Sequence, residues 1–239
     1  MTVERTRLPT GQPARELAAS GRTLRLAHRG DWRRATENSI EALVLASMVP
    51  GCDGVEFDVR ASTDGVPILL HDETLERVQH VSARADEMPA DELESLGVPR
   101  LVDALAALPQ QAFLDVELKE DLADRVVDMR AAARGPHLAN AVVSSFEPAV
   151  IRGIRQRMPA WPTWLNTKDC SEETIETARS LGCRGVSVEW HAIDASAVTA
   201  ATNAGLEVAG WTVTRQPTYR RLERMGLRAL CVERQALTG

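Results

Sequence analysis

The sequence predicts an α/β barrel of eight parallel strands formed by a single domain. Its 239 residues suit one domain of this architecture. A hydrophobic fraction of 44% with 26% charged residues is ordinary for a chain that folds around a packed core. From about residue 24 onward, short apolar β-type runs alternate with amphipathic helical stretches, which is the pattern of parallel strands joined by helices. We expect residues 1–20 to form a loosely held tail and residues 21–239 to form the barrel domain.

Nine segments have the composition and length of strands. They are Leu24–His28, Gly54–Val59, Val66–His71, Ala112–Leu118, Ala141–Phe146, Pro162–Leu165, Gly185–Val188, Glu207–Val213 and Leu227–Val232. Seven further segments have helical periodicity: Asn38–Met48, Leu101–Ala107, Leu122–Ala133, Pro148–Arg157, Ser171–Ser180, Ser196–Asn203 and Pro217–Met225. Gly182, Gly205 and Gly226 each follow one of these helical segments, as glycines that end helices do.

Nine strands are one too many for a barrel of eight. The second and third candidates are separated only by Arg60–Gly65, which ends in the turn signal Thr63-Asp64-Gly65 and is too short for an ordinary parallel crossover. A hairpin about Asp64-Gly65 accounts for the surplus strand and sets Asp58 opposite His71. An unusually tight crossover is the alternative.

Charge and cysteine content exclude several classes of protein. A net charge of −6 and an isoelectric point near 5.5 argue against a general nucleic-acid or membrane-surface binder, but a small anionic substrate needs only a few local cations. The four cysteines form no C-x-x-C pair, so we expect free thiols in a reducing compartment. The chain has no secretory-type apolar segment at its start and no run near the ~18 apolar residues of a membrane span. We expect a cytoplasmic protein without stable membrane association.

Carboxylates lie on two strands that are otherwise apolar enough to be buried. Strand alternation places Glu56 and Asp58 on one face of the second predicted strand. Asp115, Glu117 and Lys119 share a face of the fourth. Buried carboxylates are costly unless a cation neutralises them, and carboxylate oxygens are the ligands that Mg2+ and Ca2+ prefer. The pattern therefore indicates one divalent cation held by Glu56, Asp58 and Glu117.

A second interpretation of these carboxylates stays open. They can be strand-end charges that face solvent, or they can form ion pairs with Arg60 and Lys119. Each strand taken alone fits either interpretation, because alternating charges at strand ends are common.

Two histidines also fall at the ends of predicted strands. His28 ends the first strand and His71 ends the third, so a barrel brings them toward one end, where side chains are placed for catalysis. Imidazoles with a pKa near ~6.5 can serve as general acid and general base at neutral pH. Trp211 lies near the end of a late strand, where a substrate could pack against its ring.

At these residues the sequence resembles the glycerophosphodiester phosphodiesterase family, and the ordered set of matches spans most of the chain. The matching segments are Ala27-His28-Arg29-Gly30, Glu37-Asn38-Ser39, Gly54-Val55-Glu56-Phe57-Asp58-Val59, Thr63-Asp64-Gly65-Val66-Pro67, His71-Asp72, Val116-Glu117-Leu118-Lys119, Ser144-Ser145-Phe146 and Gly210-Trp211-Thr212-Val213. Members of the family often close with Thr-Asp-x-Pro after the last strand. Here the corresponding stretch is Cys231-Val232-Glu233-Arg234-Gln235.

The resemblance implies a TIM-type (β/α)8 barrel that hydrolyses small glycerophosphodiesters to sn-glycerol 3-phosphate and an alcohol with one divalent cation. Carried over to this chain, it makes Glu56, Asp58 and Glu117 the metal ligands and His28 and His71 the acid–base pair. It further implies that Arg29 and Lys119 contact the phosphate, and we add Trp211 as a substrate-binding residue.

Three alternatives remain beside this hypothesis. A lysophospholipase D of the same family would act on lipid-bearing diesters, which requires an apolar groove or an interfacial helix. A catalytically silent barrel would bind phosphodiesters or a partner without turnover. A metal-dependent aldolase or isomerase on a similar barrel would also use an anion-binding pair such as Arg29 and Lys119.

Overall fold

The computed structural model describes residues 21–122, 124–126 and 133–239 of the chain. The predicted tail at residues 1–20 lies outside the described residues, and so does most of the helix predicted at Leu122–Ala133. Both stay predictions.

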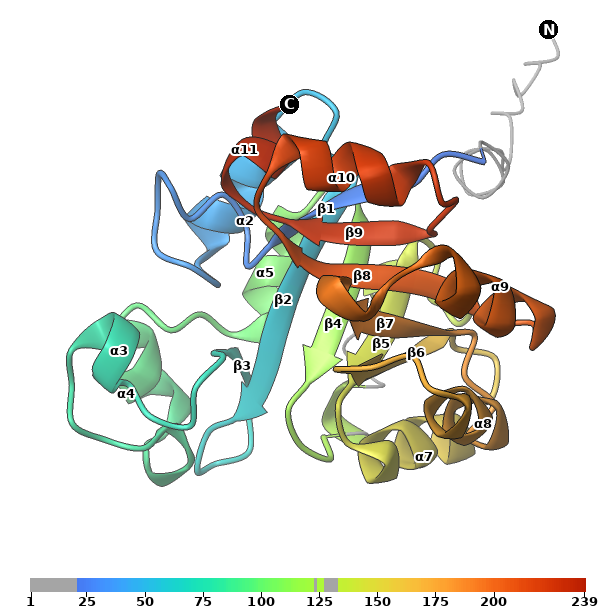
Figure 1. Cartoon of the computed structure of the whole chain (residues 1–239). Helices are drawn as coiled ribbons and strands as arrows, with labels where there is room; N and C mark the ends of the chain where they lie inside the picture. The colour runs from blue at the N-terminus through green and yellow to red at the C-terminus, as the bar shows by residue number, and fades with distance from the viewer. Residues whose placement is uncertain (1–20, 123, 127–132) are drawn as a thin grey trace, which may run out of the picture.

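Eight parallel strands close into a barrel, as predicted. The strands are β1 (Leu24–His28), β2 (Gly54–Ala61), β4 (Phe113–Leu118), β5 (Ala141–Ser145), β6 (Thr163–Thr167), β7 (Gly185–Glu189), β8 (Glu207–Val213) and β9 (Ala229–Val232). Closure comes from β1, which pairs in parallel with β2 on one edge and with β9 on the other (Figure 1). The alternation of strands and helices therefore predicted the architecture correctly.

Helices follow most strands and cover the outside of the barrel (Figure 1). The longer ones are α2 (Ile40–Ser47), α5 (Leu101–Ala107), α7 (Pro148–Arg157), α8 (Glu172–Ser180), α9 (Ala195–Asn203) and α10 (Gln216–Glu223). Side chains of Ser39, Ser171 and Asp194 cap the first turns of α2, α8 and α9 by accepting backbone N–H bonds. Among the described residues, no helix combines the length and apolarity that crossing a membrane requires.

The surplus strand β3 (Pro67–Leu69) forms the expected hairpin by pairing antiparallel with the end of β2. The expected register is wrong by one residue, because Leu70 rather than His71 lies opposite Asp58, with its N–H 3.2 Å from the Asp58 carbonyl oxygen. Ser62 and Val66 close a three-residue loop, and Gly65 adopts a positive φ of 70° in it. The prediction assumed a two-residue loop, and the additional loop residue shifts the pairing.

An insertion follows β3 and has a small apolar core of its own. It contains the short elements α3 (Glu76–Gln79), η1 (Ala85–Glu87) and α4 (Ala90–Ser95), none of which the sequence analysis predicted. The insertion lies beside the end of the barrel toward which β2 runs (Figure 1). Its core consists of Ile68, Leu70, Leu75, Ala85, Ala90, Leu93 and Val98.

The main core lies between the barrel wall and the surrounding helices. Val55, Phe57 and Val59 of β2 point into it and are fully buried. The alternate residues of the same strand, Glu56 and Asp58, therefore point to the barrel interior, as the alternation predicted. Two short elements complete the chain: η2 (Trp190–Ala192) after β7 and α11 (Arg234–Thr238) after β9.

Candidate active site

Three carboxylates meet inside the barrel where β2 and β4 run side by side. The parallel register places Glu56 beside Asp115 and Asp58 beside Glu117. One ligand oxygen from each of Glu56, Asp58 and Glu117 lies within 4.8 Å of the other two. All three side chains are buried, Asp58 completely. The structure therefore brings the predicted ligand trio together, and it excludes the interpretation in which these carboxylates face solvent.

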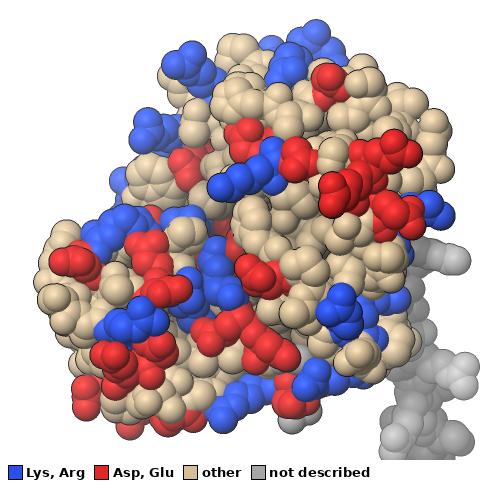
Figure 2. Space-filling view, turned by 60° about the horizontal axis from the view of Figure 1, so that its bottom comes forward, with Lys and Arg blue, Asp and Glu red and all other residues tan. Residues whose placement is uncertain are grey.

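A cavity of about 270 Å³ opens above this trio, at the carboxyl ends of the barrel strands. Among its lining residues are all the predicted site residues except Asp58: His28, Arg29, Glu56, His71, Glu117, Lys119 and Trp211. Asp58 is part of the acidic trio but is completely buried beneath the cavity. Figure 2 shows the molecule from the side that the arrowheads of β2 and β4 point to in Figure 1, with acidic and basic side chains interspersed across it.

Asp58 is already neutralised by cations. Its carboxylate lies 2.7 Å from the Lys119 ammonium and 3.1 Å from Nε of Arg29. Asn38 donates a further hydrogen bond of 2.9 Å through Nδ2. Burial by itself would raise the pKa of Asp58, but Lys119 and Arg29 hold this pKa well below its ordinary value. Asp58 is therefore charged at neutral pH.

Glu56, two residues earlier on the same strand, has the opposite environment. Burial raises the pKa of Glu56 well above its ordinary value, and the charges of Asp58, Glu117 and Asp115 raise it further. Its Oε1 atom is buried and has no hydrogen-bond partner among the described residues. Burial also raises the pKa of Glu117, although Lys119 opposes this effect. Glu117 is paired with Lys119, whereas Glu56 has no ion pair with a lysine or arginine among the described residues, so an additional cation would supply positive charge beside Glu56.

Each of the two histidines is held by a carboxylate at Nδ1. His28 Nδ1 lies 2.6 Å from Oε1 of Glu233, and His71 Nδ1 lies 2.6 Å from Oδ1 of Asp72. An ionised carboxylate can only accept, so Nδ1 is the donor in both pairs and Nε2 is left for other chemistry. Nε2 of His28 faces the trio, 3.8 Å from Glu56. Burial lowers the pKa of His71, although Asp58 acts in the opposite direction, and this favours the neutral ring.

Arg29 is linked to His71 through Glu37. Its carboxylate pairs with Arg29 at 2.9 Å and with Arg77 at 2.6 Å. Arg77 also donates to Asp72, the partner of His71. The insertion thus fixes His71 relative to Arg29, and the sequence analysis assigned no role to Glu37 or Arg77.

Further lining residues lay outside the predicted set. Asp115 accepts a 2.6 Å hydrogen bond from Ser144. Strand alternation places Asp115 on the same face of its strand as Glu117, and this pattern could have predicted that it lines the cavity. Phe146 forms an edge-to-face contact with Trp211 at 5.3 Å between ring centroids, and Trp211 donates through Nε1 to the Ser187 carbonyl at 2.9 Å. The other lining residues that the sequence analysis did not predict are Asn166, Ser187, Thr212 and Cys231.

The fold and the cavity together define a class of protein. A (β/α)8 barrel carries its active site at the carboxyl ends of its strands. Here that end combines an acidic trio suited to a divalent cation, two oriented imidazoles and two partly buried cations suited to an anionic substrate. Such a set of groups is typical of a metal-assisted hydrolase.

Comparison with known proteins narrows this class. The model of the glycerophosphoryl diester phosphodiesterase family matches residues 28–237. The chain belongs to this family, and the expected enzyme class is thereby confirmed at the level of the family. The matched region includes every predicted site residue from His28 to Trp211.

Individual relatives are similar over different lengths. A glycerophosphodiester phosphodiesterase from Caldanaerobacter subterraneus subsp. tengcongensis is 23% identical over 86% of this chain and 92% of its own length. Glycerophosphodiester phosphodiesterase 1 from Mus musculus is 28% identical over 62% of this chain, and the aligned part spans 50% of the mouse protein.

Solved structures share the fold. An Oleispira antarctica phosphodiesterase, solved in complex with the product sn-glycerol-3-phosphate, has a TM-score of 0.77 at 24% identity over 90% of this chain and 94% of its own. A glycerophosphodiester phosphodiesterase from Thermotoga maritima has a TM-score of 0.75 at 23% identity over 88% and 94%.

Proposed function

We propose that this protein hydrolyses small glycerophosphodiesters to sn-glycerol 3-phosphate and an alcohol. The observation that supports this most is the convergence, in one cavity of about 270 Å³, of an acidic trio, two imidazoles and two cations. The family match over residues 28–237 indicates the substrate class. The product bound to the Oleispira antarctica relative is of the same class.

Glu56, Asp58 and Glu117 are proposed to hold one divalent cation, Mg2+ or Ca2+. These residues fit such an ion, because they offer hard oxygen donors within 4.8 Å of one another and Oε1 of Glu56 is buried without a partner. When bound, the cation would supply Lewis-acid stabilisation of the negative charge on the phosphoryl group.

Arg29 and Lys119 are proposed to bind the phosphate. A phosphodiester is a monoanion, and its transition state gathers more charge on the phosphoryl oxygens, so two cations lining the cavity stabilise it more than the ground state. Trp211, whose ring is fixed by Phe146 and Ser187, offers an apolar face for the rest of the substrate. The glycerophosphodiester is the only partner that this proposal requires.

His28 and His71 are proposed to transfer the protons of the reaction. One imidazole removes a proton from the attacking group, which is water or the neighbouring glycerol hydroxyl, and the other protonates the leaving alkoxide. Attack by water gives glycerol 3-phosphate directly, whereas attack by the glycerol hydroxyl gives a cyclic phosphate that water must then open, with the two imidazoles exchanging roles. Glu233 and Asp72 fix the two rings by binding Nδ1, so Nε2 of each ring is the atom that exchanges the proton.

The experiment is an assay of glycerol 3-phosphate release from glycerophosphocholine. We expect activity that EDTA removes and that Mg2+ or Ca2+ restores. His28→Ala and His71→Ala should each lose about 10²–10⁴-fold in kcat, whereas His191→Ala, which removes an exposed imidazole outside the cavity, should keep full activity. Full activity in EDTA, in Glu56→Ala or in His28→Ala would contradict the proposal.

A cytoplasmic location belongs to the same proposal. Cys52, Cys170, Cys183 and Cys231 carry free thiols in the structure, which suits a reducing compartment. Cell fractionation with a tagged full-length chain tests it, and recovery in an oxidising compartment or in the membrane fraction would contradict it.

A further inference from the structure

A second and larger cavity lies at the opposite end of the barrel from the candidate active site. Its volume is about 490 Å³. Its lining residues surround the amino ends of the strands: Phe113 begins β4, Ala141 begins β5, Arg184 precedes β7 and Arg228 precedes β9. Active sites of such barrels lie at the other end, so this cavity has no part in the proposed hydrolysis.

The lining of this cavity is strongly basic. Arg155, Arg184 and Arg228 contribute to it, and no aspartate or glutamate is among its described lining residues. The chain as a whole has the opposite bias, with 34 acidic against 28 basic residues. A concentration of guanidinium groups in a concave site of an acidic protein attracts small anions.

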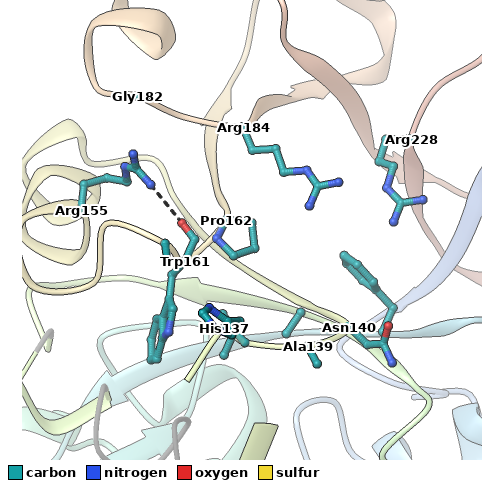
Figure 3. Close-up of a pocket in the computed structure, with 13 residues that line it drawn as sticks. His137, Ala139, Asn140, Arg155, Trp161, Pro162, Gly182, Arg184 and Arg228 are labelled. Atoms are coloured by element: carbon teal, nitrogen blue, oxygen red, sulfur yellow. Dashed lines mark hydrogen bonds between the residues drawn. The ribbon is translucent and has the colours of Figure 1, made fainter. Parts of the chain in front are cut away.

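Two of the three arginines lie beside the same carboxylate. Oε1 of Glu207 lies 2.8 Å from Arg184 and 3.8 Å from Nε of Arg228. Figure 3 shows the guanidinium groups of these two arginines side by side at the cavity, so two positive charges there pair with one carboxylate. Burial lowers the pKa of Arg228, although Glu207 opposes this effect, and the charge of Arg184 lowers it further. A bound anion would stabilise both charges.

The third arginine adds charge at the rim of the cavity. The guanidinium of Arg155 donates to the carbonyl oxygens of Pro159 and Trp161, the latter at 3.3 Å (Figure 3). Carbonyl oxygens have no net charge, so they fix this guanidinium without neutralising it. His137 and Asn140 provide further polar groups at the cavity.

Apolar surface accompanies the cations. The Arg228 guanidinium lies 5.6 Å from the centroid of the Phe113 ring, which lines the same cavity. Pro162 is partly exposed and adds apolar surface to the lining. The neighbouring Trp161 is fully buried and is anchored by a 3.0 Å hydrogen bond from Nε1 to the Pro136 carbonyl. A ligand that fits has an anionic head and a planar or apolar body, and ~300–1,000 Å³ is the usual size of small-molecule pockets.

We propose that this cavity is a binding site for a small organic phosphate, with Arg184 and Arg228 holding the phosphate group and Phe113 packing against the body of the ligand. Arginine is suited to this role because its planar fork binds phosphate oxygens in a bidentate manner. The site is independent of the proposed hydrolysis, since the residues of the two cavities are entirely different.

The test is calorimetric titration of the full-length protein in EDTA with phenyl phosphate, which combines a dianionic phosphate with a planar apolar body. We expect binding that weakens as the salt concentration rises. Arg184→Gln should weaken it by about tenfold or more, because the charge-assisted hydrogen bonds of the guanidinium are lost. Arg184→Lys should restore part of the affinity. Arg179→Gln is the matched control, because this exposed arginine pairs with Glu176 on α8, outside the cavity.

A neutral steric variant separates charge from shape. Ala139 is exposed and lines the cavity between His137 and Asn140 in Figure 3, so Ala139→Phe should block binding without changing the charge. Phenol should not bind, and benzoate should bind at least tenfold more weakly than phenyl phosphate.

Three outcomes would overturn the proposal. The first is that phenyl phosphate does not bind. The second is binding that Lys119→Met in the other cavity abolishes while Arg184→Gln leaves it unchanged. The third is benzoate binding as tightly as phenyl phosphate, which would overturn the assignment of the head group as phosphate. Unfolding temperatures of all variants are measured alongside, and the half-exposed position of Arg184 makes a folding defect unexpected there.

Discussion

Replacing Glu56 by Gln should make the metal-free protein more stable and at the same time inactive. Glu56 is 4% exposed, and its Oε1 has no hydrogen-bond partner among the described residues. Its Oε2 accepts the backbone N–H of Arg29 at 3.2 Å, and the amide oxygen of Gln can take over that bond. The substitution therefore removes a charge and leaves the shape and this hydrogen bond in place.

The size of the stabilisation follows from the neighbours of Glu56. Burial and three nearby carboxylates raise its pKa, and each unit of such a shift corresponds to about 1.4 kcal/mol of unfavourable free energy when the group is ionised. We expect Glu56→Gln to raise the free energy of unfolding by about 1–2 kcal/mol at pH 8 in EDTA, the usual size of a single-substitution effect. For a protein of this size, that is a rise in Tm of about 2–4 °C per kcal/mol.

The pH dependence of this gain has a definite sign. A carboxyl group whose pKa is higher in the folded state than in the unfolded state destabilises the protein at every pH above the unfolded-state pKa. There the unfolded state has released the proton, whereas the folded state either keeps the proton or buries the charge. Below the ordinary glutamate range, both states are protonated and the penalty disappears. The advantage of Glu56→Gln should therefore shrink as the pH falls from 8 toward 4.

Differential scanning calorimetry with and without the divalent cation is the assay. The wild type should gain about 2.7 kcal/mol at a cation concentration a hundred times its Kd, and Glu56→Gln should gain much less. The order of the two Tm values then reverses between EDTA and saturating cation. Glu147→Gln, the same change at an exposed residue, serves as the control and should alter neither curve.

Two results would refute this reasoning. A lower Tm for Glu56→Gln in EDTA would show that the carboxylate at this position stabilises the protein without metal. An equal gain from the cation in both proteins would show that Glu56 is not a ligand.

Two further substitutions have expected outcomes. Asp58→Asn should destabilise the metal-free protein by about 1–3 kcal/mol in urea unfolding at pH 7, because Arg29 and Lys119 each lose one of their two carboxylate partners. Because the pKa of Asp58 is depressed, the contribution of its carboxylate to stability is complete above the ordinary aspartate range and is lost as the pH falls. The cost of Asp58→Asn should therefore be smaller at pH 3 than at pH 7. A larger cost at pH 3 would contradict the conclusion that Asp58 is ionised and paired in the folded protein. Glu233→Gln should lower kcat by about 10–100-fold with little change in KM, because His28 loses a charge-assisted hydrogen bond. Glu189→Gln, which weakens the matching contact to the exposed His191, should leave kcat unchanged, and equal effects of the two variants would argue against positioning.

The acidic trio could be predicted from the sequence because charged residues that alternate with apolar ones along a buried strand must all point to the face opposite the apolar residues. On β2, three apolar residues flank Glu56 and Asp58, so once the apolar face packs against helices the carboxylates must enter the barrel. The parallel pairing of β2 with β4 then places Glu117 beside Asp58. Alternation and topology together are sufficient for this part of the site.

Local sequence did not determine the opposite electrostatic environments of the two β2 carboxylates. Asn38 lies in the loop before α2, and Lys119 follows β4, yet both contact Asp58 rather than Glu56. The direction in which a flexible lysine side chain points depends on the packed site. Strand alternation treats the two carboxylates as equivalent, although in the metal-free protein one is neutralised by protein cations and the other is not.

The partner of His28 shows how barrel closure determines the geometry of the catalytic groups. Glu233 is 205 residues away in the chain, and no local pattern connects it to His28. The pairing of β9 with β1 aligns Val232 with Ala27. The next residues along the chain are Glu233, just after β9, and His28, the last residue of β1, and they therefore come together at the rim of the barrel. Oε1 of Glu233 lies 2.6 Å from Nδ1 of His28. The stretch that departs from Thr-Asp-x-Pro therefore supplies the partner of His28, and the register of the last strand is the information needed to predict this contact.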